Sequence, residues 1–192
     1  AIFVSVDARQ AAAGFIGMEE EGQLENNPVG EARGIFPGRV VWAHNPDITT
    51  WDGNGNFWDD AHNDQAVADQ MVVDTVRVLS GMDSPADAWD AIFKWFNAFH
   101  ERGDGGYSEG EKIAIKINQN NTGNDGQVNT DEINGNPHLI LALLKTLVED
   151  AGVPEDMITV YDGSRFITDN IFDKCNAVYP DVVFVDHVGG NG

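Results

Sequence analysis

Polar side chains follow four short apolar runs of the chain. The runs RVVWAH (39–44), KIAIKIN (112–118), MITVYD (157–162) and VVFVD (182–186) each have the composition of a buried strand. In a parallel sheet, the carboxyl ends of the strands meet at one edge, and the amides of helix N-termini point into the same space. The sequence therefore predicts a ligand-binding site at that edge, formed by His44, Lys116, Asn118, Asp162, Ser164, Arg165, Asp186 and His187.

The segment Asp162-Gly163-Ser164-Arg165 is the most informative of these strand ends. It combines a carboxylate, a flexible glycine and a guanidinium that can hold a carboxylate or phosphate through two hydrogen bonds. The alternative is that such residues only make turns or cap the next helix. The sequence contains no G-x-G-x-x-G, G-x-x-x-x-G-K or G-x-S-x-G motif, so neither a nucleotide nor a hydrolase nucleophile elbow is indicated.

Lys116 lies within an apolar run, between Ile115 and Ile117. Because side chains alternate along a strand, it either shares a solvated face with Lys112 or places a cation near the ligand end of the sheet. Its position alone does not decide between these two.

Two segments rich in Asp and Asn could bind calcium through oxygen ligands. WDGNGNFWDD (51–60) alternates acids and amides as a calcium loop does, but Phe57 stands where that loop needs glycine. NTGNDGQVNTDE (121–132) has Gly123 in place of the third ligand and follows a strand, which excludes an EF-hand. The alternative is that both are ordinary polar turns. The candidate metal ligands are Asp52, Asn54, Asn56, Asp59, Asp60, Asn121, Asp125, Asn129 and Glu132.

The overall charge narrows the range of partners. The 192 residues include 32 Asp and Glu but 11 Lys and Arg, a formal net charge of −21. Such a surface repels nucleic acids and anionic membranes and suits a secreted or salt-adapted protein. The single cysteine, Cys175, excludes an intramolecular disulfide and a self-contained iron–sulfur cluster. No apolar run is long enough to span a membrane. We expect an extracytoplasmic protein, and a first residue that is not Met fits a cleaved or trimmed start.

Turn and capping signals divide the chain into elements. Residues 1–30 are predicted as an arm and linker that begins with the strand-like AIFVSV, and residues 31–192 as one α/β domain. Helices are expected over 64–80, 84–99, 137–152 and 167–175. The apolar stripe of the second is predicted to be core. Helices that alternate with strands imply a mainly parallel sheet with crossover helices on its faces.

Several of these segments recur in order in a known family. NPVGEARGIFPGRVVWAHNPD, the W-D-G and W-D-D stretch, GEKIAIKIN, the AGVP segment with DGSR, and FVDHVGG resemble the family known as domain of unknown function 362 between about residues 27 and 192. The resemblance implies that this chain is the N-terminal part of a larger exported bacterial protein. It also implies that Lys116, Asn118, Asp162, Ser164 and Arg165 belong to a recurring pattern, although Gly163 stands where relatives often have Ala. The resemblance implies no reaction. Some relatives carry ferredoxin-type iron–sulfur clusters, but this chain has a single cysteine, so that feature is not expected here.

Two functions follow from these features. The first is an α/β domain with a small anionic-ligand or metal-binding site at the strand ends, with His44, Asp162 or His187 as acid–base or metal-binding groups. The second is a non-enzymatic, cation-stabilised module that assembles into homo-oligomers through its N-terminal β arm.

Overall fold

The computed structural model describes residues 30–120 and 134–190. The predicted arm, residues 1–30, therefore lies almost wholly outside the described residues. The described helices and strands follow in the order α2 (Gln65–Ser80), α3 (Pro85–Phe99), β1 (Ile113–Lys116), α4 (Pro137–Lys145), β2 (Ile158–Tyr161), α5 (Asp169–Asn176), β3 (Val183–Asp186) and β4 (Gly189–Gly190). Short helical turns lie at Pro46–Ile48, Thr146–Asp150 and Glu155–Met157.

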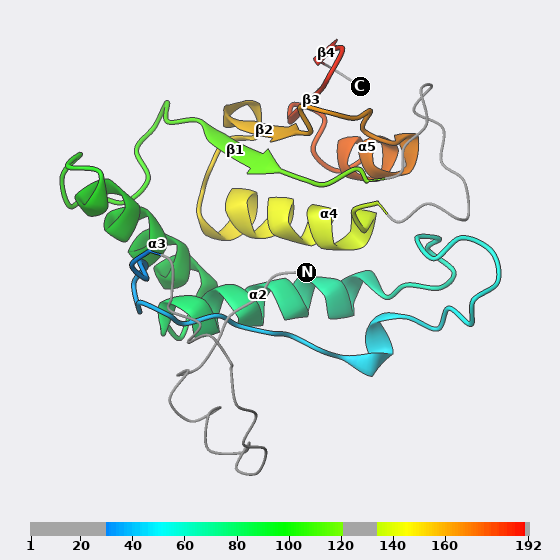
Figure 1. The fold of residues 1–192 in the computed structure, drawn as a ribbon, viewed down its shortest axis with the longest axis horizontal. Helices are drawn as coiled ribbons and strands as arrows, with labels where there is room; N and C mark the ends of the chain where they lie inside the picture. The colour runs from blue at the N-terminus through cyan, green and yellow to red at the C-terminus, as the bar shows by residue number, and fades with distance from the viewer. Residues whose placement is uncertain (1–29, 121–133, 191–192) are drawn as a thin grey trace, which may run out of the picture.

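The strands form one sheet in the order β1-β2-β3-β4 (Figure 1). β1, β2 and β3 run parallel, and β4 pairs with β3 in the antiparallel direction. The register aligns Lys116 with Tyr161 and Tyr161 with Val185, so the three parallel strands end level with one another. The predicted α/β class with a mainly parallel sheet is confirmed.

The main core lies between the sheet and helices α4 and α5. Ile158, Val160 and Phe184 are each 0% exposed on the covered face of the sheet, and they pack with Leu144 of α4 and Ile171 of α5. The opposite face carries Tyr161, which is 37% exposed. In the part of the chain that the structure describes, the helices packed on the sheet therefore cover one face of it.

A second layer of helices packs on α4 from the side away from the sheet (Figure 1). Val72 and Val76 of α2 form a smaller core with Ala88 of α3 and Ala142 of α4. α4 thus lies between the sheet and α2, and it is buried on both sides.

Capping residues begin α2, α3 and α4, and end α2, where the sequence predicts, whereas α4 gives way to a π-helical turn after Lys145 and α5 begins at Asp169 rather than at residue 167. The side chain of Asp64 accepts hydrogen bonds from the amides of Ala66 and Val67 at the start of α2. Ser84 accepts from Asp87 and Asn136 accepts from His138 in the same way. Gly81, with φ of 73°, ends α2 in the left-handed conformation that glycine adopts without strain.

The predicted strand at 39–44 is wrong. The segment has no regular secondary structure, and Trp42 is 68% exposed. Its path follows α2 rather than the sheet (Figure 1), because the Arg39 guanidinium lies 3.6 Å from the centre of the Phe36 ring and donates a hydrogen bond to the carbonyl of Val78.

The apolar stripe of α3 is core only in part. Trp89 and Phe93 pack against the main core, whereas Phe96 is 41% and Phe99 is 42% exposed. The prediction that the whole stripe is core was wrong for these two rings, because the C-terminal half of α3 projects beyond the other helices (Figure 1).

Candidate functional site

The carboxylate of Asp162 joins two strand ends at the carboxyl edge of the sheet. Asp162 is 2% exposed. Its Oδ2 accepts a hydrogen bond of 2.8 Å from the amide of Gln119, which follows β1. Its Oδ1 accepts from the amide and the hydroxyl of Ser164, at 2.9 and 3.0 Å. The carboxylate therefore fixes the DGSR loop to the end of β1.

The pKa of Asp162 reflects these donors. Burial by itself raises the pKa, but the hydrogen bonds from Gln119, Ser164 and Lys116 outweigh burial and bring the pKa down to about 2. Asp162 is therefore charged at neutral pH, where it holds the two loops together, and it is poorly suited to accept a proton as a general base.

Lys116 lies on the solvated face of β1 and also places its charge near the carboxyl edge of the sheet, so both interpretations of its sequence position apply. Its side chain starts from an exposed position of β1 and is 42% exposed. Its Nζ nevertheless reaches the edge of the sheet, 3.2 Å from Asp162 Oδ2 and 2.9 Å from Asn118 Oδ1. The positive charge of Lys116 is thus already compensated by Asp162.

Arg165 follows β2, Asp186 is the last residue of β3 and His187 follows it, so all three lie at the same edge. Asp186 Oδ1 accepts a hydrogen bond of 2.9 Å from the amide of Val188, so it stabilises a turn. The His187 ring packs edge-on against Phe166, with the ring centres 4.4 Å apart. Arg165 is exposed, and its guanidinium has no hydrogen bond or ion pair with the rest of the described chain. It is the cation at this edge that can take a ligand.

His44 does not belong to this group. The segment that carries it runs along α2, on the side away from the sheet (Figure 1), and its ring stacks on Trp42 with the centres 5.4 Å apart. Its assignment to the strand-end site was therefore wrong, because it depended on the strand at 39–44.

The acidic loop around residues 52–60 uses several of its oxygens internally. Asp52 Oδ1 accepts hydrogen bonds from the amide and the side chain of Asn54, at 3.0 and 3.2 Å. The Asn56 side chain donates to Asp59 Oδ1 at 3.4 Å. Across residues 30–120 and 134–190, no group of three or more His, Cys, Asp or Glu is placed to hold a metal ion. The second predicted loop, with Asn121, Asp125, Asn129 and Glu132, lies outside the described residues.

Calcium is expected to raise the melting temperature (Tm) of the chain more than magnesium does at the same concentration. A ligand that binds only the native state stabilises it by mass action, and Asp and Asn oxygens suit calcium, which accepts six to eight oxygen ligands in variable geometry, better than magnesium, which requires a strict octahedron. Differential scanning fluorimetry measures the shift, and Asp52→Asn should reduce it whereas Asp47→Asn should not. If sodium chloride at matched ionic strength reproduces the whole shift, the candidate loops are only solvated surface.

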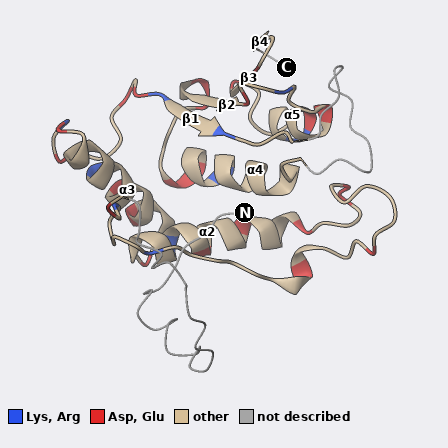
Figure 2. Cartoon of the chain, viewed as in Figure 1, with Lys and Arg blue, Asp and Glu red and all other residues tan. Residues whose placement is uncertain are grey.

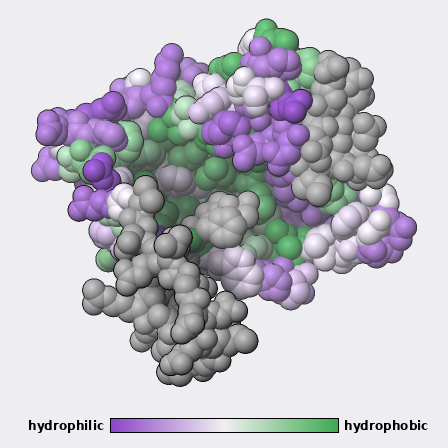
Figure 3. All heavy atoms as spheres, in the orientation of Figure 1, coloured by the Kyte–Doolittle hydropathy of each residue, from purple (hydrophilic) through white to green (hydrophobic). Residues whose placement is uncertain are grey.

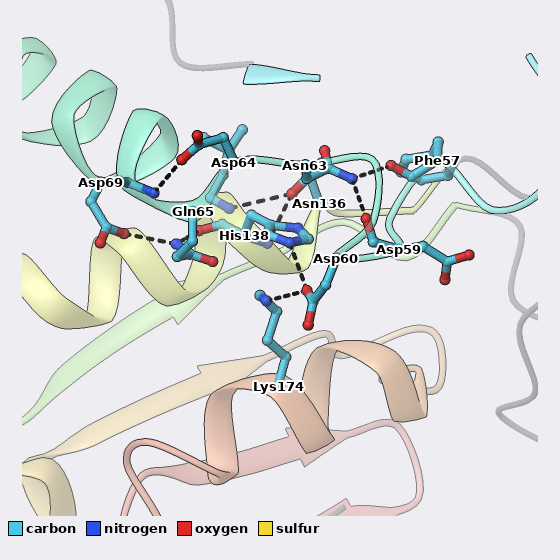
Figure 4. Close-up of polar contacts among 12 residues, drawn as sticks. Phe57, Asp59, Asp60, Asn63, Asp64, Gln65, Asp69, Asn136, His138 and Lys174 are labelled. Carbon is cyan, nitrogen blue, oxygen red and sulfur yellow. Dashed lines mark hydrogen bonds and ion pairs between the residues drawn. The ribbon is translucent and has the colours of Figure 1, made fainter. Parts of the chain in front are cut away.

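A second polar cluster lies beneath the sheet edge, and sequence reasoning missed most of it (Figure 4). His138, in the first turn of α4, is 1% exposed, and its Nε2 lies 2.9 Å from Asp60 Oδ1. Lys174 of α5 donates to the same oxygen at 2.6 Å. This cluster connects α4, α5 and the loop before α2. Asp60 was predicted as a metal ligand, yet its carboxylate already pairs with Lys174 and His138.

The electrostatics of this cluster keep His138 neutral. Burial lowers the pKa of the imidazole and Lys174 lowers it further, and together they outweigh the opposite effect of Asp60 and Asp69. Neutral His138 can donate from Nε2 to Asp60. Its Nδ1 is buried and has no hydrogen-bond partner among the described residues.

A cleft of about 550 Å³ opens beside this cluster. Its wall includes Trp58, Asp60, Asn170 and Lys174. Hydrogen bonds from Lys174 and His138 lower the pKa of Asp60, although its burial opposes them. The Asp60 carboxylate can therefore orient a donor group in the cleft, but it is a weak base. The sequence signal for His138 was its place in the Asn136-Pro137 helix start, which says nothing about a partner 78 residues away.

No family model matches this chain, and neither a curated protein nor a solved structure does. The resemblance described above therefore stays a prediction. None of the described helices is both long and apolar enough to cross a membrane.

Proposed function

We propose that this chain is an extracytoplasmic ligand-binding domain that holds a small carboxylate or phosphate anion at the carboxyl edge of its sheet. The observation that carries the proposal is the exposed guanidinium of Arg165, which has no polar partner among the described residues and follows a loop that Asp162 fixes. A preorganised loop loses little conformational freedom on binding.

The charge balance of the chain supports this assignment. Acidic side chains are spread over helices and loops, whereas basic ones are few (Figure 2). Lys116, Lys145 and Lys174 each pair with a carboxylate. A guanidinium that stays unpaired amid so many acids can form two parallel hydrogen bonds with an anion.

The start of α5 adds to the same site. α5 begins four residues after Arg165 with Asp169 in its first turn, and among the described residues no side-chain hydrogen bond caps its N-terminus. The Thr168 hydroxyl instead donates to the side chain of Gln119, at 3.4 Å. Backbone amides at a helix N-terminus favour an anion, so an anion held by Arg165 would gain from this end of the helix. The extracytoplasmic location is supported by the excess of 32 acidic over 11 basic residues.

Replacing Arg165 with alanine is expected to weaken binding of phosphate or a small dicarboxylate by at least about tenfold, the value of one charge-assisted hydrogen bond. Isothermal titration calorimetry at constant ionic strength, with phosphate and then succinate, measures this loss. Arg33→Ala is the matched control, because Arg33 is also exposed but packs on Phe99, away from the sheet edge. Equal affinity in the Arg165→Ala and original chains would show that the anion site is elsewhere.

A further inference from the structure

An apolar groove lies between the C-terminal half of α3 and the first residues of β1. Its volume is about 550 Å³, within the range of ligand pockets. Ile92, Phe93 and Phe96 of α3 form one wall, and Ile113 and Ala114 of β1 form part of the other. Hydrophobic surface is visible between α3 and the sheet (Figure 3). The exposed part of the α3 stripe thus faces a hollow large enough for a ligand.

The walls of this groove are held in place by ring contacts and hydrogen bonds. The Phe93 ring lies between Trp89 and Tyr107, with the ring centres 5.7 Å apart in both pairs. The Tyr107 hydroxyl donates to the carbonyl of Glu111 at 3.0 Å. The side chain of Asn97 donates to the carbonyl of Gly105 at 3.0 Å, which ties the segment after α3 back to the helix. The groove is therefore preformed.

Two cations line the same groove, Arg102 and Lys112. Neither has a side-chain hydrogen bond or ion pair within residues 30–120 and 134–190, although the chain has 32 acidic residues. The Arg102 guanidinium lies 5.5 Å from the centre of the Phe96 ring. The acid that lines the groove, Glu111, accepts a hydrogen bond of 2.7 Å from the amide of Ser108, within its own turn. The groove thus combines apolar walls with two positive charges that form no ion pair among the described residues and with one carboxylate held within its own turn.

We propose that this groove binds an amphipathic carboxylate, with the apolar chain against Phe93 and Phe96 and the carboxylate between Arg102 and Lys112. Burial of the apolar chain supplies most of the affinity, because Phe96 is 41% exposed without a ligand. The two cations select the head group, since an uncharged or positive head group gains nothing from them. This site uses none of the residues of the anion site at Arg165.

Calorimetry with decanoate, decanol and decylamine, each below its aggregation concentration, tests the proposal. We expect decanoate to bind at one site, and decylamine at least about tenfold more weakly, as the loss of a charge-assisted hydrogen bond implies. The double variant Arg102→Ala with Lys112→Ala should lower decanoate affinity by about tenfold or more and leave decanol affinity unchanged. Phe96→Ala should weaken the binding of both decanoate and decanol. Lys94→Ala is the matched control, because Lys94 lies on α3 but pairs with Asp90.

Three outcomes would overturn the proposal. Decylamine binding as tightly as decanoate would mean attraction to the acidic surface. Unchanged decanoate affinity in the double variant, with circular dichroism confirming its fold, would remove the head-group contact. Decanoate binding that appears only after residues 1–20 are deleted would assign the groove to the N-terminal arm. Arg165→Ala should keep full decanoate affinity, so a failure of the anion site and a failure of this groove are distinguishable.

Discussion

Asp162→Ala is expected to lower the free energy of unfolding by about 3 kcal/mol, because it removes a buried carboxylate that accepts three hydrogen bonds. The substitution leaves the amides of Gln119 and Ser164 without their acceptor and leaves Lys116 without its counter-charge. Gln119 is buried, so its amide carries the full desolvation cost of losing its acceptor, whereas Ser164 is exposed and its amide can turn to water. Urea denaturation at neutral pH measures the loss. Asp83→Asn, which changes an exposed carboxylate, is the control and should leave the stability nearly unchanged.

The same carboxylate should make the fold sensitive to acid. The pKa of Asp162 is lowered from 3.8 to about 2 in the folded chain. A lowered pKa stabilises the fold above the unfolded-state value, and that stability is lost as the pH falls from about 4 towards 2. The difference corresponds to about 2 kcal/mol. Asp162→Asn should remove this part of the pH dependence. If the Asp162→Asn chain keeps the full slope between pH 4 and 2, other carboxylates are responsible.

His138→Ala is expected to lower the free energy of unfolding by about 2 to 4 kcal/mol, because it opens a cavity at a fully buried position of α4. The bond to Asp60 adds little to this cost, since the Asp60 side chain is 81% exposed. His138→Gln keeps a donor of similar reach and should cost less. Guanidinium denaturation at pH 7.5 of the original chain, His138→Gln and His138→Ala should give free energies of unfolding that decrease in that order.

His138 should also make the stability depend on pH, but here the fold favours the neutral form of the side chain, whereas at Asp162 it favours the charged form. The pKa of the folded imidazole is below its ordinary value of 6.5. The unfolded chain therefore takes up a proton first, and stability is lost as the pH falls below about 6.5, until the folded imidazole also titrates. His138→Gln should flatten this slope, whereas His44→Gln, at an exposed ring, should not. An unchanged slope in His138→Gln would mean that His138 titrates alike in both states.

The parallel part of the sheet could be predicted because its signals are local. The apolar runs that became β1, β2 and β3 are separated by strong helix starts, such as Asn136-Pro137. Their order along the chain then places Asp162, Arg165 and His187 at one edge. RVVWAH carries the same apolar signal but packs along α2, because composition indicates burial without naming the partner.

Contacts between distant segments could not be predicted in this way. Asp60 and His138 are 78 residues apart, and nothing in either local sequence refers to the other. The exposure of Phe96 has a similar cause. A stripe at helical spacing predicts which residues share a face of α3. It does not predict where the neighbouring elements stop covering that face, and there the groove begins.

The burial of α4 on both sides affects how the molecule opens. One side of the helix contributes Leu144 to the core beneath the sheet, and the other contributes Ala142 to the core shared with α2. Both cores therefore depend on the position of α4. The layers should therefore come apart in one cooperative transition, so that slow amide exchange in α2 and in β2 reports the same event. A ligand bound at the sheet edge would then protect α2 as well, although α2 does not touch it.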